Sequence, residues 1–449
     1  MSLSKVLETI SDNHLEFIRM EVSDVYGIAR SRTVPARHFE NTCKSGLFMP
    51  LATYCFNGAG ADADKYDCGL CWEVGYGDVK LHPDLETFQV IPWCENTGRV
   101  LMNAELGGKP MMVCPRGIAN IQLQKLEEMG YSLFSAHEYE FYVVDAKTRE
   151  PLLKDGNLLS TLRTYTDTKL LHQLMRDLPK VGVDIESAEG EGGVGQMEIT
   201  YRPAFGLRSA DNAHTYKLSV KEIARQHGYM ASFMSKPWPN RSGSSSHFCH
   251  SLWDAKTKEP LVYGKDSPCG MSEVAQHWVA GLLEHAPALT ILASPTVNCL
   301  SRLKPNTFAP VNSTWGIDNR TTAMRIKING QKGTFIENRI GASGSNPYLL
   351  LAGTVIAGMD GIKRKLPLPQ ESTGNSYEAN GVHPCGQDLP NTMERAVEAL
   401  KADKVMVEAL GPDFIKCFLA MKKKELVESR QAVTNKDGEW ERKMFFEYL

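Results

Sequence analysis

The stretch FSAHEYEFYVVD, residues 134–145, constrains the fold more than any other part of the chain. Its aromatic and β-branched residues predict a strand, and side chains alternate between the two faces of a strand. Glu138 and Glu140 therefore share one face, while Tyr139 and Phe141 point to the opposite face. Two neighbouring carboxylates repel each other when ionised, and a divalent cation is the usual compensation. The alternative is an exposed strand face whose acids are solvated.

The length and composition limit the class of protein. A chain of 449 residues can bury a large core and form two or more domains. The net charge of -3 gives no indication of a nucleic-acid or membrane partner, and no run of about 18 apolar residues predicts a membrane span. The 11 cysteines fit reduced thiols in a cytoplasmic protein, and the start of the chain is unlike a signal peptide. Cys68 and Cys71 form a Cys-x-x-Cys pair, which we interpret as structural or incidental because no second pair follows at zinc-finger spacing.

The order of predicted elements indicates an α+β protein of two domains. A short helix, ending near Asp12, is followed by strand candidates that make a small N-terminal domain over residues 1–108. The larger domain, residues 109–449, opens with a helix over 115–130. In it, strands that carry charged residues alternate with long helices, predicted over 209–228, 270–292 and 346–363.

Two further segments contain candidate metal ligands. In EGEGGVGQMEI, residues 189–199, glycines permit a tight loop, after which Gln196 and Glu198 share a strand face, with Glu191 at the entry of the loop. An ordinary hairpin explains this pattern equally well. His247, in the segment SGSSSHFCHSL, is a second candidate, although a lone histidine is more often a hydrogen-bonded residue of the core or surface.

Arginines recur in segments that otherwise resemble buried strands. Burial of an unpaired guanidinium is costly, so an anionic ligand explains them better than a separate salt bridge for each. A planar guanidinium binds carboxylate or phosphate through two hydrogen bonds, and glutamate oxygens favour Mg²⁺ or Mn²⁺. Cations beside phosphate-binding cationic residues are the apparatus of phosphoryl transfer. The cationic residues concerned are Arg302, Arg320, Arg325, Arg339 and Lys332.

These motifs, taken in order, resemble the glutamine synthetase family in its bacterial-type (class I) form. The similarity covers nearly the whole chain, and the segments SADNAHTYKLSV and SHFCHSLWD are most similar to the lengsin branch of animals. The motifs that carry it are AHEYEFY, ExGxGQxE at 191–198, His247 after a Gly/Ser loop, an arginine before Ala-Pro at 302–310, NRxxxxRI at 319–326, IExR at 336–339 and the NPYL segment at 346–362.

The resemblance implies a fold, a reaction and an assembly. The fold is a small β-grasp-like N-terminal domain beside a large catalytic domain, whose curved antiparallel sheet is flanked by helices. In the reaction, the side-chain carboxylate of glutamate attacks the γ-phosphate of ATP, and ammonia or a larger amine then displaces phosphate from γ-glutamyl phosphate. The implied assembly is a ring of subunits, commonly a double hexamer, with each active site between two neighbours.

The resemblance also implies roles for individual residues. Two sites for Mg²⁺ or Mn²⁺ would use Glu140, Glu191 and Glu198 in one, and Glu138, His247 and Glu337 in the other. The substrate would contact Arg302, Arg339, Gly243 and Phe308, and the nucleotide would contact Ser251, Arg320, Arg325 and Lys332. Arg320, Arg339 and Glu337 would be the catalytic residues.

The departures from the family pattern concentrate on the ammonium site. Ser242 precedes Gly243 where the family has asparagine, Cys249 replaces a second histidine, and Phe308 replaces the flap glutamate. The Asp-Gly-Ser-Ser segment has no counterpart at 46–53, and the tyrosine modified in bacterial regulation has none near 381–390. Three functions remain open: a ligase that uses ammonia or, on these changes, a larger amine; a lengsin-like structural protein; and a regulator that binds metal and nucleotide.

Overall fold

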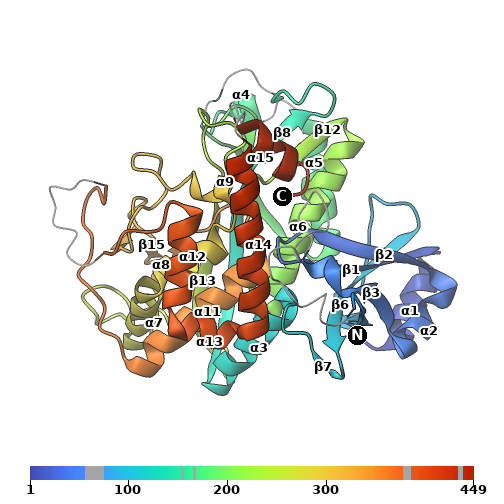
Figure 1. The fold of residues 1–449 in the computed structure, drawn as a ribbon, viewed down its shortest axis with the longest axis horizontal. Helices are drawn as coiled ribbons and strands as arrows, with labels where there is room; N and C mark the ends of the chain where they lie inside the picture. The colour runs from blue at the N-terminus through green and yellow to red at the C-terminus, as the bar shows by residue number, and fades with distance from the viewer. Residues whose placement is uncertain (56–74, 153–155, 157, 165–167, 378–385, 433–437) are drawn as a thin grey trace.

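Two β-sheets organise the molecule, one in each part of the chain (Figure 1). The computed structural model describes residues 1–55, 75–152, 156, 158–164, 168–377, 386–432 and 438–449. Figure 1 shows the N-terminal sheet, in blue, beside a larger body in which helices surround the second sheet. This arrangement confirms the expected α+β class.

The N-terminal sheet has the strand order β2-β1-β6-β4-β3. Its hairpin forms where Gly27, at φ 83°, completes a turn that the Asp24 side chain closes by accepting from the Ile28 amide. Strands β1 and β6 are parallel, and β7 pairs with β6, so this sheet extends to Pro110. The predicted domain boundary at 108/109 stays a prediction. The strands are β1 (Phe17–Ser23), β2 (Ala29–Pro35), β3 (Leu47–Pro50), β4 (Asp78–Pro83), β5 (Gln89–Val90), β6 (Thr97–Leu106) and β7 (Lys109–Pro110).

The second sheet has the order β14-β15-β16-β13-β8-β10-β9, and β11 and β12 also pair with β8. All of its described pairs are antiparallel, as expected, except β14 with β15, which is parallel. The long β8 lies next to four other strands. The strands are β8 (Tyr131–Asp145), β9 (Ile185–Gly190), β10 (Gln196–Tyr201), β11 (Ala204–Phe205), β12 (Tyr229–Ser232), β13 (Ser246–Asp254), β14 (Trp315–Ile317), β15 (Met324–Lys327) and β16 (Phe335–Asn338).

Helices cover the sheets, and one predicted helix is divided. The segment 270–292 forms two helices that meet at His285, because Pro287 lacks an N–H for the helical ladder. The helices are α1 (Leu3–Asp12), α2 (Phe39–Ser45), α3 (Pro115–Glu128), α4 (Thr161–Thr164), α5 (Thr168–Asp177), α6 (Leu207–Gln226), α7 (Glu273–Glu284), α8 (Ala286–Ala293), α9 (Val297–Leu300), α10 (Gly330–Gly333), α11 (Pro347–Arg364), α12 (Met393–Ala402), α13 (Lys404–Leu410), α14 (Pro412–Gln431) and α15 (Glu439–Phe445). Short 3-10 turns are η1 (Ala36–His38), η2 (Leu51–Tyr54), η4 (Leu85–Thr87) and η5 (Leu178–Val181).

The apolar face of β8 packs against α6, which leaves the opposite face for the acids. Tyr139 stacks on Tyr216 with ring centroids 5.7 Å apart, and Phe141 lies 5.2 Å from Phe233. All four rings are fully buried. None of the helices in the described ranges is both long and apolar enough to cross a bilayer.

Candidate active site

The register of the large sheet brings the candidate ligands onto one face. Glu138 on β8 lies opposite His247 on β13, and Glu140 lies opposite Glu198 on β10. On the far side of β13, Glu337 of β16 lies opposite Cys249. Residues that are about 200 positions apart in the sequence are thus separated by one or two strand spacings of about 5 Å.

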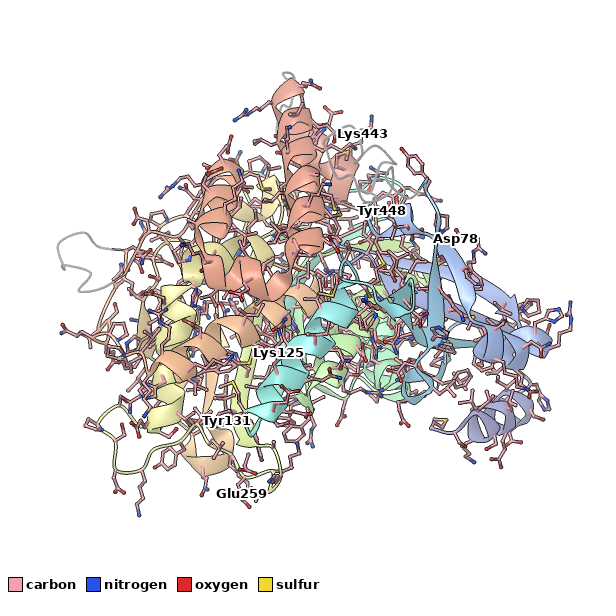
Figure 2. All side chains as sticks on the ribbon, turned by 60° about the horizontal axis from the view of Figure 1, so that its bottom comes forward. Asp78, Lys125, Tyr131, Glu259, Lys443 and Tyr448 are labelled. Carbon is pink, nitrogen blue, oxygen red and sulfur yellow. The ribbon has the colours of Figure 1, made fainter. Side chains whose placement is uncertain are left out.

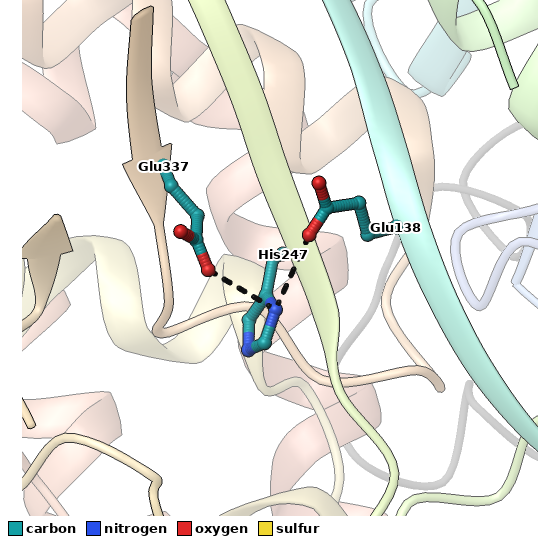
Figure 3. A group of neighbouring side chains, drawn as sticks. All are labelled: Glu138, His247 and Glu337. Atoms are coloured by element: carbon teal, nitrogen blue, oxygen red, sulfur yellow. Dashed lines mark ion pairs between the residues drawn. The ribbon is translucent and has the colours of Figure 1, made fainter. Parts of the chain in front are cut away.

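Glu138, His247 and Glu337 form a compact cluster (Figure 3). One nitrogen or oxygen of each lies within 4.8 Å of the others, and His247 Nδ1 is 3.7 Å from Glu138 Oε2 and 3.3 Å from Glu337 Oε1. Burial and the nearby arginines lower the pKa of His247 well below its usual value, so its imidazole is neutral and has a lone pair to offer a metal. Burial and the charge of Glu337 raise the pKa of Glu138 to about 7.

Two of the four arginines have acid partners within the chain. Arg325 donates to Glu337 at 2.8 Å and also binds Asp318, and Arg339 forms an ion pair with the other oxygen of Glu337. Acids of the chain thus compensate part of the charge of this pair, and the expectation that an anionic ligand also binds these arginines stays a prediction. The prediction that these arginines lie in buried strands is confirmed only for Arg325. Arg320 lies in an exposed turn.

Arg302 and Arg339 nevertheless keep donors that can bind an anion. Arg302 is 5% exposed and its Nη2 donates to the carbonyls of Arg339, Ile340 and Gly341. The Nε atoms of Arg302 and Arg339 are buried without a hydrogen-bond partner among the described residues. Gly243 lies against Arg302, because a Cβ at this position would be 2.8 Å from Cγ of the arginine. Burial lowers the pKa of Arg302 to about 10.

The second set of acids shares the sheet face without forming a second compact cluster in the described part of the chain. Glu140 accepts from Gln196 Nε2 at 2.8 Å and from the hydroxyl of Ser245. Burial and the charge of Glu140 raise the pKa of Glu191 to about 7 and that of Glu198 to about 10. Acids that resist ionisation in this way are stabilised by a cation. The roles of these three residues stay predictions.

A pocket of about 240 Å³ opens beside the compact cluster. Its lining includes Glu138, Cys249, Ser251 and Lys332. Ser251 accepts a hydrogen bond from Trp253 at 2.8 Å, and Cys249 donates to Glu138 at 3.3 Å. The pocket thus places two residues of the expected nucleotide site next to an acid of the expected metal site.

Phe308 has an unusual conformation at the edge of the site. Its backbone φ is 56°, a value that residues other than glycine rarely adopt, and the residue is 67% exposed. The carbonyl of Phe308 accepts from Arg339 at 3.1 Å, which ties this flap to the arginine beside Glu337.

Sequence reasoning missed the serines that support the acids. Ser245 binds Glu140, and Ser343 donates to the backbone of Glu140. The only available signal was the serine-rich run before His247. Cys68 and Cys71, and residues 381–385 of the expected regulatory segment, lie outside the described residues.

Comparison with known protein families places the chain in one of them. The model of the glutamine synthetase catalytic domain matches residues 112–443. The chain belongs to the glutamine synthetase family. Lengsin of Rattus norvegicus is 34% identical over 460 residues, which cover 100% of this chain and 78% of lengsin. A glutamate–isopropylamine ligase of Pseudomonas sp is 30% identical over 445 residues, with 96% of each chain covered.

Solved structures of glutamine synthetase relatives have the same architecture. A structure described as a GmaS/ADP complex superimposes with a TM-score of 0.85 at 26% identity, covering 97% of this chain and 98% of that one. This agreement extends over both sheets. The acids, the histidine and the arginines that the sequence motifs singled out therefore lie in a fold that this chain shares with glutamine synthetase relatives.

The residues of this glutamine synthetase site fit a divalent cation. The compact cluster offers two carboxylates and a neutral imidazole, which is a donor set suited to Mg²⁺ or Mn²⁺. The unpartnered Nε atoms of Arg302 and Arg339 fit an anionic substrate in the same region.

Proposed function

We propose that the chain is an ATP-dependent ligase that joins the side-chain carboxylate of glutamate to an amine larger than ammonia. The observation that carries this proposal is the exposed apolar Phe308, attached through its carbonyl to Arg339 at the edge of an acid and arginine cluster. The cluster supports phosphoryl transfer, and the flap supports the choice of nucleophile.

In the first step, the glutamate carboxylate oxygen attacks the γ-phosphorus of ATP and ADP leaves. A cation held by Glu138, His247 and Glu337 would neutralise charge on the phosphates. Arg339 and Arg302 would orient the substrate through their free donors, and Arg320 and Arg325 would contact the phosphates. Because little covalent help is needed, the contribution of these residues is position and charge.

In the second step, the amine nitrogen attacks the acyl carbon of γ-glutamyl phosphate, phosphate leaves, and the nitrogen loses a proton. An ammonium ion needs anionic groups around it, and Phe308 and Leu51, near the position of the missing Asp-Gly-Ser-Ser segment, offer none. An apolar flap instead buries the carbon substituent of an alkylamine, at about 0.8 kcal/mol for each buried CH₂. The similarity to a glutamate–isopropylamine ligase supports this substrate class.

A second function, a lengsin-like binding or structural protein without turnover, has one observation in its favour. Glu337 is 2% exposed and both of its oxygens are already paired, with Arg325 and Arg339. A cation must compete with these two guanidinium groups for Glu337. Such an internal network stabilises the fold when no metal is bound, as a protein with a structural role requires.

We also propose a ring of subunits, as the family resemblance implies. Mass measurement by light scattering after size-exclusion chromatography tests this directly. A single-chain mass close to 49.9 kDa would contradict it.

The decisive experiment measures ADP release with glutamate, ATP and Mg²⁺ or Mn²⁺, against ammonium and a panel of alkylamines, with γ-glutamyl amide detected by mass spectrometry. We expect product with at least one alkylamine and a lower kcat/KM with ammonium. Product with ammonium alone would contradict the proposed specificity. Binding of ATP without product from any amine would favour the lengsin-like function.

A further inference from the structure

Another pocket, lined by several charged residues, lies between the N-terminal hairpin and helix α6, away from the candidate active site. Its volume is about 280 Å³. We call it the α6 pocket, and no residue that we assign to metal, nucleotide or glutamate lines it. Its lining includes Gly27, His214, Lys217, Lys221, Arg225 and Tyr448.

Two lysines, one helical turn apart on α6, line this pocket. Lys217 is 6% exposed, and its Nζ donates to the carbonyls of Ser343 and Ser345 at 3.0 and 3.2 Å. Lys221 Nζ donates to the carbonyl of Tyr448 at 2.7 Å. In the described ranges, neither ammonium has a carboxylate within 4.0 Å. Each ammonium carries three N–H donors, so both have donors left over.

The two acids that line the pocket are committed to other partners. Glu222 accepts from Arg19 at 2.6 Å through one oxygen and from the Trp93 indole at 2.8 Å through the other. Glu447 forms an ion pair with Arg225. Neither acid forms an ion pair with the two lysines, although the charge of Glu447 still acts on Lys221.

A buried imidazole provides a second, independent indication of a ligand. His214 lines the pocket, is 2% exposed, and its Nε2 has no hydrogen-bond partner in the part of the chain that the structure describes. Burial and the charge of Arg99 lower the pKa of His214 to about 3, so the ring is neutral and can carry its N–H on Nε2. Burial also lowers the pKa of Lys217 to about 8, because no anion lies next to it. Unpartnered buried donors of this kind are rare in folded proteins.

We propose that the α6 pocket binds a small oxyanion of the phosphate or carboxylate class, held by Lys217, Lys221 and His214. Such an anion would satisfy the spare donors and link the hairpin at Gly27 to the catalytic domain. This site is independent of the proposed ligase activity, and the same anion can also bind the active-site arginines, so the experiment must separate the two.

The test is titration of the full-length protein with inorganic phosphate and, separately, with malonate, at an ionic strength kept constant with chloride. Calorimetry gives the stoichiometry and thermal unfolding gives the shift in Tm. We expect a site that Arg320→Gln retains and Lys221→Gln weakens by about tenfold, the loss expected for one charge-assisted hydrogen bond. Lys125→Gln is the matched control, because Lys125 is exposed on α3 and Figure 2 shows it apart from Tyr448.

The possible outcomes decide the proposal. Binding of phosphate or of malonate with this pattern supports it and names the anion class. Equal binding by Lys221→Gln and wild type, loss of the site in Arg320→Gln, or no binding beyond the chloride control would overturn it. If Lys221→Gln does not fold, the wild-type and Arg320→Gln titrations must still show one common site; its absence overturns the proposal. Failure of the alkylamine assay leaves all of these results unchanged.

Discussion

Replacement of Glu337 separates the metal role of this residue from its structural role. Glu337 is 2% exposed, and its two oxygens pair with Arg325 and Arg339 while Oε1 lies 3.3 Å from His247. Glu337→Ala removes one ligand of the compact cluster and leaves both guanidinium groups without this acid. We therefore expect the variant to lose metal binding and also to be less stable in the metal-free state.

The loss of stability follows from what each arginine retains. In the variant, Arg325 keeps its ion pair with the half-exposed Asp318, so the change at Arg325 contributes little to the loss of stability. Arg339 is 4% exposed and, among the described residues, keeps only the hydrogen bond to the Phe308 carbonyl. An uncompensated buried charge costs about 3–5 kcal/mol, so we expect Glu337→Ala to lower the free energy of unfolding by about 3 kcal/mol. Glu337→Gln, which can still accept hydrogen bonds, should lower it by about half as much.

Urea unfolding with and without Mn²⁺ measures both effects. Wild type should gain about 2.7 kcal/mol from the compact cluster at a metal concentration of about 100 Kd, and both variants should lose this gain and keep at most what the separate Glu140, Glu191 and Glu198 site supplies. ADP release should fall below detection in both. The control Glu398→Ala removes an exposed acid and should change stability by about 0.5 kcal/mol or less, with ADP release unchanged. A Glu337→Ala protein as stable as wild type without metal, or equally stabilised by Mn²⁺, would refute the reasoning.

Two further predictions concern other parts of the chain. Phe308→Glu places an acid on the flap and should raise kcat/KM for ammonium relative to an alkylamine; an unchanged ratio in the ADP-release assay would show that the flap does not select the amine. Burial lowers the pKa of His285, but hydrogen bonds to Asp403 and Asp360, at 2.6 and 2.9 Å, outweigh burial and raise it. A raised folded pKa means that this stabilisation is complete below the unfolded value of about 6.5 and is lost as pH rises through the folded value. The deficit in Tm of His285→Gln relative to wild type should therefore be larger at about pH 6 than at about pH 9, and an equal deficit at both would contradict the assignment.

The strand patterns and motif order predicted much of the candidate site. Alternation on β8 placed Glu138 and Glu140 on one face and Tyr139 on the other, as the packing of Tyr139 against Tyr216 confirms. The motifs predicted the family, because the order of motifs can be read along a single sequence and does not depend on distances in the folded protein. Local signals failed at 270–292, where Pro287 divides the predicted helix.

Pairing across strands was beyond the reach of the sequence. A period of two tells which face a side chain occupies, but not which residue of a distant strand lies opposite it. The sequence by itself determined that the chain contains Glu138, His247, Glu337 and the arginines, and which of them can share a strand face. Only the tertiary structure decided that Glu337 pairs with Arg325 and Arg339, and that Lys217 and Lys221 form no ion pair with an acid of the described residues, because burial and register between distant segments set each charge's partners.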